Sequence, residues 1–386
     1  MLDACMPRGA NKARLAPRSR GRGARGTMLR RRLLVLLRPA EIRVRRASSG
    51  GGAASKGELY EQLTPTEHVL RRPAMYVGSM SAQPEPLWLL EDSGLMVYRE
   101  AHYVPGLYKI FDEILVNALD NRQRDPYGTD RISVEIDSRT GRTSVTNTGL
   151  GMPVRVHESS GVHVPELIMG NLYTGSNFDD SELRTTGGRH GFGAKLTNLF
   201  STAFEVETAD VGAGLLYKQR WRENMSVRDA PEITPLTNGA IDYTTVRFTP
   251  DLPRFELDAL PADMLSIFRR RVFEAAATVA PATVEFNGEA VSLASLADLA
   301  RLYAGRELED VEFASFSNAR WKVGACISPT GAFHAVSFVN GVATHHGGNH
   351  VSHVATPLLI ELRAALAKKL KMNEEQQARC VAAAGL

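Results

Sequence analysis

The chain has 386 residues, of which 43% are apolar and 23% are charged, so it has room for two globular domains. No apolar run approaches the roughly 20 residues that a membrane span needs, and we therefore expect no membrane partner. Three scattered cysteines show no metal-ligand spacing, which argues against a zinc site.

The first 57 residues carry most of the positive charge. They hold fifteen Lys or Arg and two acidic residues, so the overall net charge of +3 leaves the remaining residues at −10. The positive net charge of the chain therefore does not indicate nucleic-acid binding by the residues after 57. An Arg-rich, acid-poor segment predicts a disordered basic leader acting as a mitochondrial or plastid transit peptide. The alternatives are an untargeted extension, untranslated sequence before Met28, and a nuclear location. Residues 47–57 ("ASSGGGAASKG") read as a flexible linker.

The elements after the linker predict an α+β fold, with helices packed against a mixed sheet. We expect helices from Pro105 to before Pro126, at 165–169, from Ala194 and at 264–280. We expect strands at 131–137, 142–149, 203–210, 215–224 and 244–251, and a hairpin around an Asn287-Gly288 turn. From about residue 292 a second unit follows, with a helix near 293–304, strands around 320–329 and 335–344, and a helix at 352–371.

A glycine-rich segment at 185–200 reads "TTGGRHGFGAKLTNLF". Its glycines let the backbone approach a ligand closely, and the helix start that follows suits phosphate. It is not a P-loop, because Ala194 separates Gly193 from Lys195 and Leu196 replaces the Ser or Thr. Leu196 also stands where a dinucleotide fingerprint needs its third glycine. A flexible surface loop is the alternative interpretation.

The helix expected at 106–121 places Glu113, Asn117 and Asn121 at positions i, i+4 and i+8, with Asp120 adjacent. These side chains share one helix face, on which we expect no lysine. An amide oxygen can bind Mg²⁺, and a carboxylate one turn away can deprotonate a water molecule. A solvated helix face is the alternative.

Two further stretches carry polar groups that suit a nucleotide. In "TNTGLGMP" (146–153), Gly149 and Gly151 permit a sharp turn and Asn147 offers an amide to a base edge. In "YTGSNFDD" (173–180), Ser176 and Asn177 can donate to a ribose or phosphate.

These pieces, in this order, resemble the ATP site of the GHKL superfamily. "GLYKIFDEILVNALDNRQRDP", "TTGGRHGFGAKLTNLFS" and "SFVNGVATHHGGNHV" resemble the ATPase region of eukaryotic-type (type IIA) DNA topoisomerase II. The resemblance runs from about residue 60 to about residue 370. It implies a GHKL (Bergerat) ATPase α/β sandwich at 58–291 and a truncated, ribosomal-protein-like transducer α/β domain at 292–386.

The resemblance also implies roles for individual residues. Glu113 would be the general base, Asn117 the Mg²⁺ ligand, and Asp120 and Asn121 their support. Asn147 would contact adenine, and Tyr76 would reach the ATP of a partner subunit. Ser176 and Asn177 would contact ribose or phosphate. The triphosphate would be wrapped by Gly188, Arg189, His190, Gly191, Phe192, Gly193, Ala194 and Lys195.

The implied function is an ATP-binding and hydrolysing gate, with ATP and Mg²⁺ as cofactors. Its homodimer would close on ATP and drive DNA strand passage, with double-stranded DNA bound by the full enzyme. The family's Gln-Thr-Lys loop and DNA-cleaving domains do not occur in this sequence, so we expect slow hydrolysis and no DNA cleavage by this chain alone. The alternatives are a catalytically weak nucleotide-binding dimerisation fragment and another GHKL ATPase.

Overall fold

The computed structural model describes residues 61–172, 174, 191–305, 313–328 and 332–370. The described residues from Leu63 onwards belong to one compact unit. The predicted leader lies outside the described residues, and the predicted domain boundary at 291/292 stays a prediction. Within the described part of the chain, no helix is long and apolar enough to cross a membrane.

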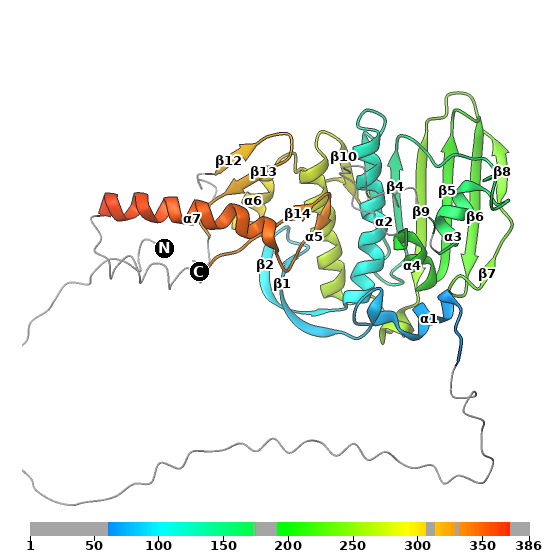
Figure 1. The fold of residues 1–386 in the computed structure, drawn as a ribbon, viewed down its shortest axis with the longest axis horizontal. Helices are drawn as coiled ribbons and strands as arrows, with labels where there is room; N and C mark the ends of the chain where they lie inside the picture. The colour runs from blue at the N-terminus through cyan, green and yellow to red at the C-terminus, as the bar shows by residue number, and fades with distance from the viewer. Residues whose placement is uncertain (1–60, 173, 175–190, 306–312, 329–331, 371–386) are drawn as a thin grey trace, which may run out of the picture. The chain divides into compact units, whose positions relative to one another are not determined.

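A mixed sheet of nine strands forms one layer of the fold (Figure 1). Its order is β11-β10-β3-β4-β9-β5-β6-β7, and β8 also pairs with β6. The β10–β3 pair is parallel and the other pairs are antiparallel. The strands are β3 (Arg131–Ile136), β4 (Thr143–Thr148), β5 (Ser201–Asp210), β6 (Leu215–Arg222), β7 (Val227–Arg228), β8 (Glu232–Pro235), β9 (Tyr243–Pro250), β10 (Thr283–Phe286) and β11 (Glu289–Ala290).

The two faces of this sheet differ in chemistry. In β5, Phe204 and Val206 are buried in the core, and the alternate residues Glu205 and Glu207 point to the other face. There Arg247 of β9 donates hydrogen bonds to both carboxylates. The alternation expected for the segments 131–137 and 142–149 is found in β3 and β4, where buried residues alternate with more exposed ones.

Helices cover the buried face of the sheet. Two long ones, α2 (Pro105–Arg124) and α5 (Ala262–Val279), lie side by side (Figure 1), and Phe111 stacks on Phe268 with 4.3 Å between ring centroids. The shorter helical elements are α1 (Pro65–Arg71), η3 (Pro73–Met75), α3 (Val164–Gly170), α4 (Gly193–Leu199) and η4 (Leu252–Phe255). These two layers form the α/β sandwich expected from the sequence.

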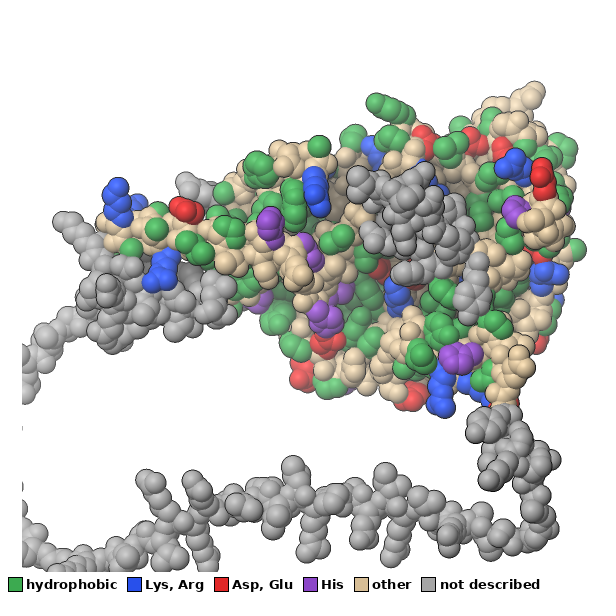
Figure 2. Space-filling model, viewed as in Figure 1, with side chains coloured by type: hydrophobic (Ala, Val, Ile, Leu, Met, Phe, Trp, Pro, Cys, Tyr) green, Lys and Arg blue, Asp and Glu red, His purple; other side chains and the backbone are tan. Residues whose placement is uncertain are grey.

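The remaining elements form small units outside the main sheet. They are the hairpins β1 (Gln83–Leu90)–β2 (Met96–Tyr103), β12 (Ala314–Ser317)–β13 (Lys322–Ala325) and β14 (Phe338–Val339)–β15 (Val342–Ala343), with helices α6 (Leu296–Ala304) and α7 (Asn349–Leu370). Leu358, Ile360 and Leu362 of α7 are exposed, and Figure 2 shows apolar side chains along this helix.

The sequence-based expectations differ from the structure at two hairpins. The β1–β2 hairpin is not among the sequence-based expectations. Pro84 and Pro86 of β1 lie in a two-stranded sheet with a free edge, where a residue without a backbone N–H is tolerated. Residues 335–344 were expected as one strand, which is wrong. Asn340 and Gly341 adopt positive φ angles of 51° and 78°, so the segment turns back as β14 and β15.

Candidate functional site

Helix α2 presents a single half-open stripe between Gly106 and Asn121, where its other residues are buried. Along this stripe Lys109, Glu113 and Asn117 follow one another at intervals of four residues, whereas Asp120 and Asn121 are buried. Glu113 and Asn117 therefore share a face as predicted. The expectation of a lysine-free face is wrong, because the same spacing brings Lys109 next to Glu113, with which it forms an ion pair.

The start of α4 lies directly against Glu113. A Cβ atom on Gly193 would be only 2.1 Å from Glu113 Oε2, so a side chain at this position cannot fit without moving the carboxylate. One turn later, Thr197 donates a hydrogen bond to the Ile110 carbonyl oxygen at 2.8 Å. Gly193 is thus a close-approach glycine that brings the end of the glycine-rich segment onto the α2 stripe.

Lys195 on α4 is a buried cation, with 3% of its surface exposed. Its ammonium group donates to the Thr174 carbonyl oxygen at 2.6 Å. Among the described residues, no carboxylate lies within salt-bridge distance of it. Burial lowers the pKa of Lys195 to about 8. A buried ammonium group balanced by one carbonyl oxygen favours an anionic ligand, because such a ligand would supply the missing charge.

The turn after β4 is held by side chains of the α2 C-terminus and the loop that follows it. Asn147 is 6% exposed near the end of β4, and Asn121 donates to Thr129 Oγ1 at 3.1 Å. Asp125 accepts hydrogen bonds from the backbone N–H groups of Leu150 and Gly128, each at 2.9 Å. These backbone hydrogen bonds lower the pKa of Asp125.

Sequence reasoning missed the role of Asp125 in this turn. The signal was present in "DPYG" (125–128), because Asp at the first and Gly at the fourth position are typical of a β-turn. Of the two glycines expected to permit the turn, only Gly149 adopts a positive φ angle, and Gly151 is required by close packing instead. Gly149 has a φ of +87°, and a Cβ on Gly151 would lie 2.1 Å from the Ala209 carbonyl oxygen.

The segment around Tyr76 contacts the same region. The hydroxyl of Tyr76 lies 2.8 Å from His68 Nδ1, and its ring centroid is 6.2 Å from that of Phe192. Gly191, Phe192 and Gly193 are partly exposed, and Ala194 and Lys195 are buried. The other predicted residues of the segment, Ser176, Asn177, Gly188, Arg189 and His190, lie outside the described residues.

Comparisons with known proteins agree on the class of domain. Residues 103–254 match the family described as "Histidine kinase-, DNA gyrase B-, and HSP90-like ATPase". The matched range includes α2, the turn after β4 and α4, the elements on which the stripe, Asn147 and Lys195 lie. The fold and the site thus define a GHKL-type ATPase domain.

More specific relatives are type II DNA topoisomerases. The chain is 42% identical to the DNA topoisomerase 2 of Candida albicans and of Arabidopsis thaliana, in each case over 84% of its own length but only 23% and 22% of theirs. The ATPase region of Saccharomyces cerevisiae topoisomerase II matches with a TM-score of 0.76 and 38% identity, covering 81% of this chain and 82% of that one. The ATPase and transducer domains of the Balamuthia mandrillaris enzyme match with a TM-score of 0.76 and 44% identity, covering 82% and 80%.

The chain therefore belongs to the DNA topoisomerase II family and corresponds to the ATPase region of its members. It spans less than a quarter of the length of the curated relatives it matches.

The lowered pKa of Lys195 predicts a pH dependence of nucleotide affinity. Below its pKa of about 8 the ammonium group of Lys195 is charged and attracts phosphate. Above this pH a growing fraction of the protein molecules carries a neutral Lys195, which must take up a proton when the nucleotide binds. The affinity for an ATP analogue should therefore fall about tenfold between pH 8 and pH 9.5, measured by isothermal titration calorimetry. Lys195→Arg is the matched control, because guanidinium stays charged in this range. A fall of equal size in Lys195→Arg would contradict the assignment.

Proposed function

We propose that this chain is the ATP-binding and ATP-hydrolysing gate of a type IIA DNA topoisomerase. The observation that carries the proposal is the position of Glu113. Its carboxylate lies between Lys109 and the close-approach residue Gly193, on a stripe shared with Asn117. The buried cation Lys195 follows Gly193 by two residues on α4. Such an arrangement offers one base, one oxygen ligand for a metal and one phosphate-binding charge within the same region.

Glu113 acts as the general base in this proposal. A carboxylate can accept a proton from a water molecule that attacks the γ-phosphate, and the ion pair with Lys109 restricts its orientation. Gly193 leaves room for that carboxylate to approach the phosphate side of the site. Lys109 is a positioning residue here, since it acts through Glu113.

The residues on the stripe also fit Mg²⁺. The side-chain oxygen of Asn117 is a hard ligand of the kind that Mg²⁺ prefers, and it lies half-buried one turn from Glu113. When bound, Mg²⁺ would neutralise phosphate charge. Asn121, through its hydrogen bond to Thr129, anchors the end of the helix that presents Asn117. Buried Asp120, one residue before Asn121, would support the same end of α2.

The remaining contacts divide between phosphates, ribose and base. Lys195 and the backbone of Gly191–Ala194 would hold the triphosphate together with Gly188, Arg189 and His190. Asn147, buried near the end of β4, would contact adenine. Ser176 and Asn177 would contact ribose or phosphate. These assignments follow from the family resemblance and, for the end of the glycine-rich segment, from the contact of Gly193 with Glu113.

In the full enzyme, we propose that two copies close on ATP and drive the passage of double-stranded DNA. Tyr76 would then reach the partner's nucleotide, which requires it to leave its hydrogen bond with His68.

We propose that the segment 1–57 acts as an organelle-targeting signal. A reporter fused to residues 1–57 should accumulate in mitochondria or plastids, and a uniformly nuclear or cytosolic signal would contradict this targeting role.

The base assignment predicts separable effects of two substitutions. Glu113→Gln should leave ATP binding within about threefold and reduce hydrolysis by about 10²–10⁴-fold, because it removes the proton acceptor and keeps the shape. Asn117→Ala should instead weaken Mg²⁺-dependent nucleotide binding. Both are measured by calorimetry with and without Mg²⁺ and by steady-state ATPase assays.

Unmutated turnover in Glu113→Gln would contradict the role of the base. Affinity unchanged by Asn117→Ala in the presence of Mg²⁺ would contradict the role of the ligand. Tight ATP binding by the unmutated chain without any turnover would leave the nucleotide-binding dimerisation module as its function.

A further inference from the structure

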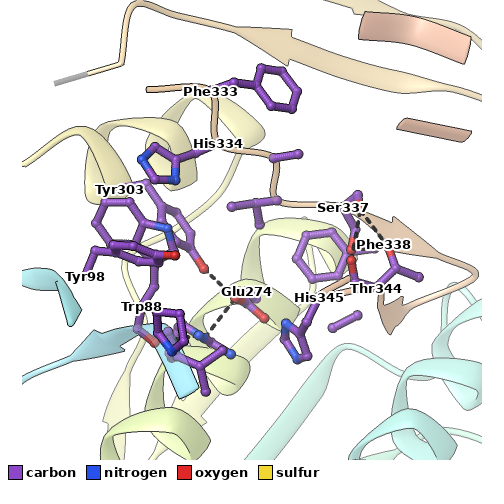
Figure 3. Close-up of a pocket in the computed structure, with 16 residues that line it drawn as sticks. Trp88, Tyr98, Glu274, Tyr303, Phe333, His334, Ser337, Phe338, Thr344 and His345 are labelled. Carbon is purple, nitrogen blue, oxygen red and sulfur yellow. Dashed lines mark hydrogen bonds and ion pairs between the residues drawn. The ribbon is translucent and has the colours of Figure 1, made fainter. Parts of the chain in front are cut away.

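A separate cavity lies where the β1–β2 hairpin, α5, α6 and residues 333–345 meet (Figure 3). Its volume is about 210 Å³, and none of the residues assigned to the nucleotide site lines it. This is smaller than the roughly 300–1,000 Å³ of sites that hold drug-sized molecules. The cavity therefore suits a ligand of one or two rings.

One wall of the cavity is aromatic. The ring of Trp88 lies 5.1 Å from that of Tyr98, 5.3 Å from that of Tyr303 and 5.3 Å from that of His334, measured between centroids. The contacts with Tyr303 and His334 are edge-to-face. Because these rings hold one another in place, they present a preformed surface for a flat ring.

The floor of the cavity holds a buried carboxylate with a free acceptor. Glu274 is 2% exposed, and its Oε1 accepts a hydrogen bond from the Tyr303 hydroxyl. Its Oε2 has no hydrogen-bond partner among the described residues. Figure 3 shows this carboxylate facing the space between the aromatic wall and His345. A buried acceptor without a partner calls for a donor, because leaving it desolvated is costly.

The charges around Glu274 favour a neutral ligand. Arg270, itself 3% exposed, places Nε 3.2 Å from Glu274 Oε1 and so balances the one carboxylate that lines the cavity. Another guanidinium N–H of Arg270 donates to the Trp88 carbonyl oxygen. A cation would find no net negative charge here, and an anion would compete with Glu274 for Arg270. Burying either in this place would carry an uncompensated desolvation cost.

We propose that this cavity is a binding site for a neutral, flat aromatic heterocycle that carries an N–H donor. The ring lies against Trp88, Tyr98 and Tyr303, and its N–H donates to Glu274 Oε2. The proposal is independent of the nucleotide site.

Two probes of nearly equal shape test the donor. Indole and 1-methylindole are titrated against the full chain by ligand-observed NMR; the second has no N–H. Indole should bind saturably and about tenfold more tightly, because 1-methylindole leaves Glu274 Oε2 unpaired. Benzylammonium, a cationic single-ring probe, should bind more weakly than indole. Equal affinity of the two indoles, tighter binding of benzylammonium, or no saturable binding of indole would each overturn the proposal; the last would mean that the cavity holds water only.

Two variants test the location. Tyr98→Ala removes a wall residue that is 45% exposed and should weaken indole binding about threefold or more without disturbing the core. Tyr127→Ala is the matched control, because Tyr127 is 94% exposed and does not line the cavity, and it should leave indole affinity unchanged. Equal indole affinity in the two variants would place the ligand elsewhere and overturn the assignment.

Discussion

The buried ion pair between Asp112 and Arg271 fixes the helix on which the candidate site is built. Arg271 Nε donates to Asp112 Oδ1 at 2.7 Å, and the two side chains are 0% and 7% exposed. Breaking such a pair by removing one partner typically costs about 3–5 kcal/mol, so α2 has little freedom to rotate against α5.

The ion pair also sets the direction of Glu113, because consecutive residues of a helix point about 100° apart. Burying Asp112 against α5 therefore directs Glu113 towards α4, where Gly193 has no side chain to obstruct it. Arg271 also donates to the Gly341 carbonyl oxygen in the β14–β15 turn. The same guanidinium thus links α2, α5 and the β14–β15 turn, which lies within the predicted transducer range of 292–386.

The charged side chains of the candidate site lie in two different environments, one partly open to solvent and one buried. The pair of Lys109 and Glu113 lies on the half-open stripe, whereas Lys195 is buried and has a lowered pKa. The unfavourable burial of Lys195 is retained because Thr197, two residues along the same helix, locks α4 to α2 through the Ile110 carbonyl oxygen. A phosphate ligand would offset the free-energy cost of burying this cation. Folding has therefore already placed a desolvated positive charge where the phosphate would bind. Membership of the topoisomerase II family and this charge arrangement both support nucleotide binding at this site.

Much of this arrangement could be predicted from the sequence, where local patterns and tertiary packing agree. The apolar spacing of α2 and the alternation in β3 and β4 indicated which faces are buried, and the Asn287-Gly288 turn identified a hairpin. The β1–β2 hairpin could not be predicted in this way, because its prolines are tolerated only by a free edge. The Asp112–Arg271 pair joins residues 159 positions apart and leaves no local signal. Lys109 and the turn at Asn340 and Gly341 were readable from spacing and composition, but were missed.

The central claim is that the α2 stripe and Lys195 together hold ATP, and a crystal structure of the chain with Mg²⁺ and a non-hydrolysable ATP analogue tests it most directly. The account predicts a phosphate oxygen within about 3 Å of Lys195 Nζ, the metal ion on the Asn117 side-chain oxygen, and the Glu113 carboxylate facing the γ-phosphate. A nucleotide bound elsewhere on the chain, or one whose γ-phosphate lies away from Glu113, would contradict it.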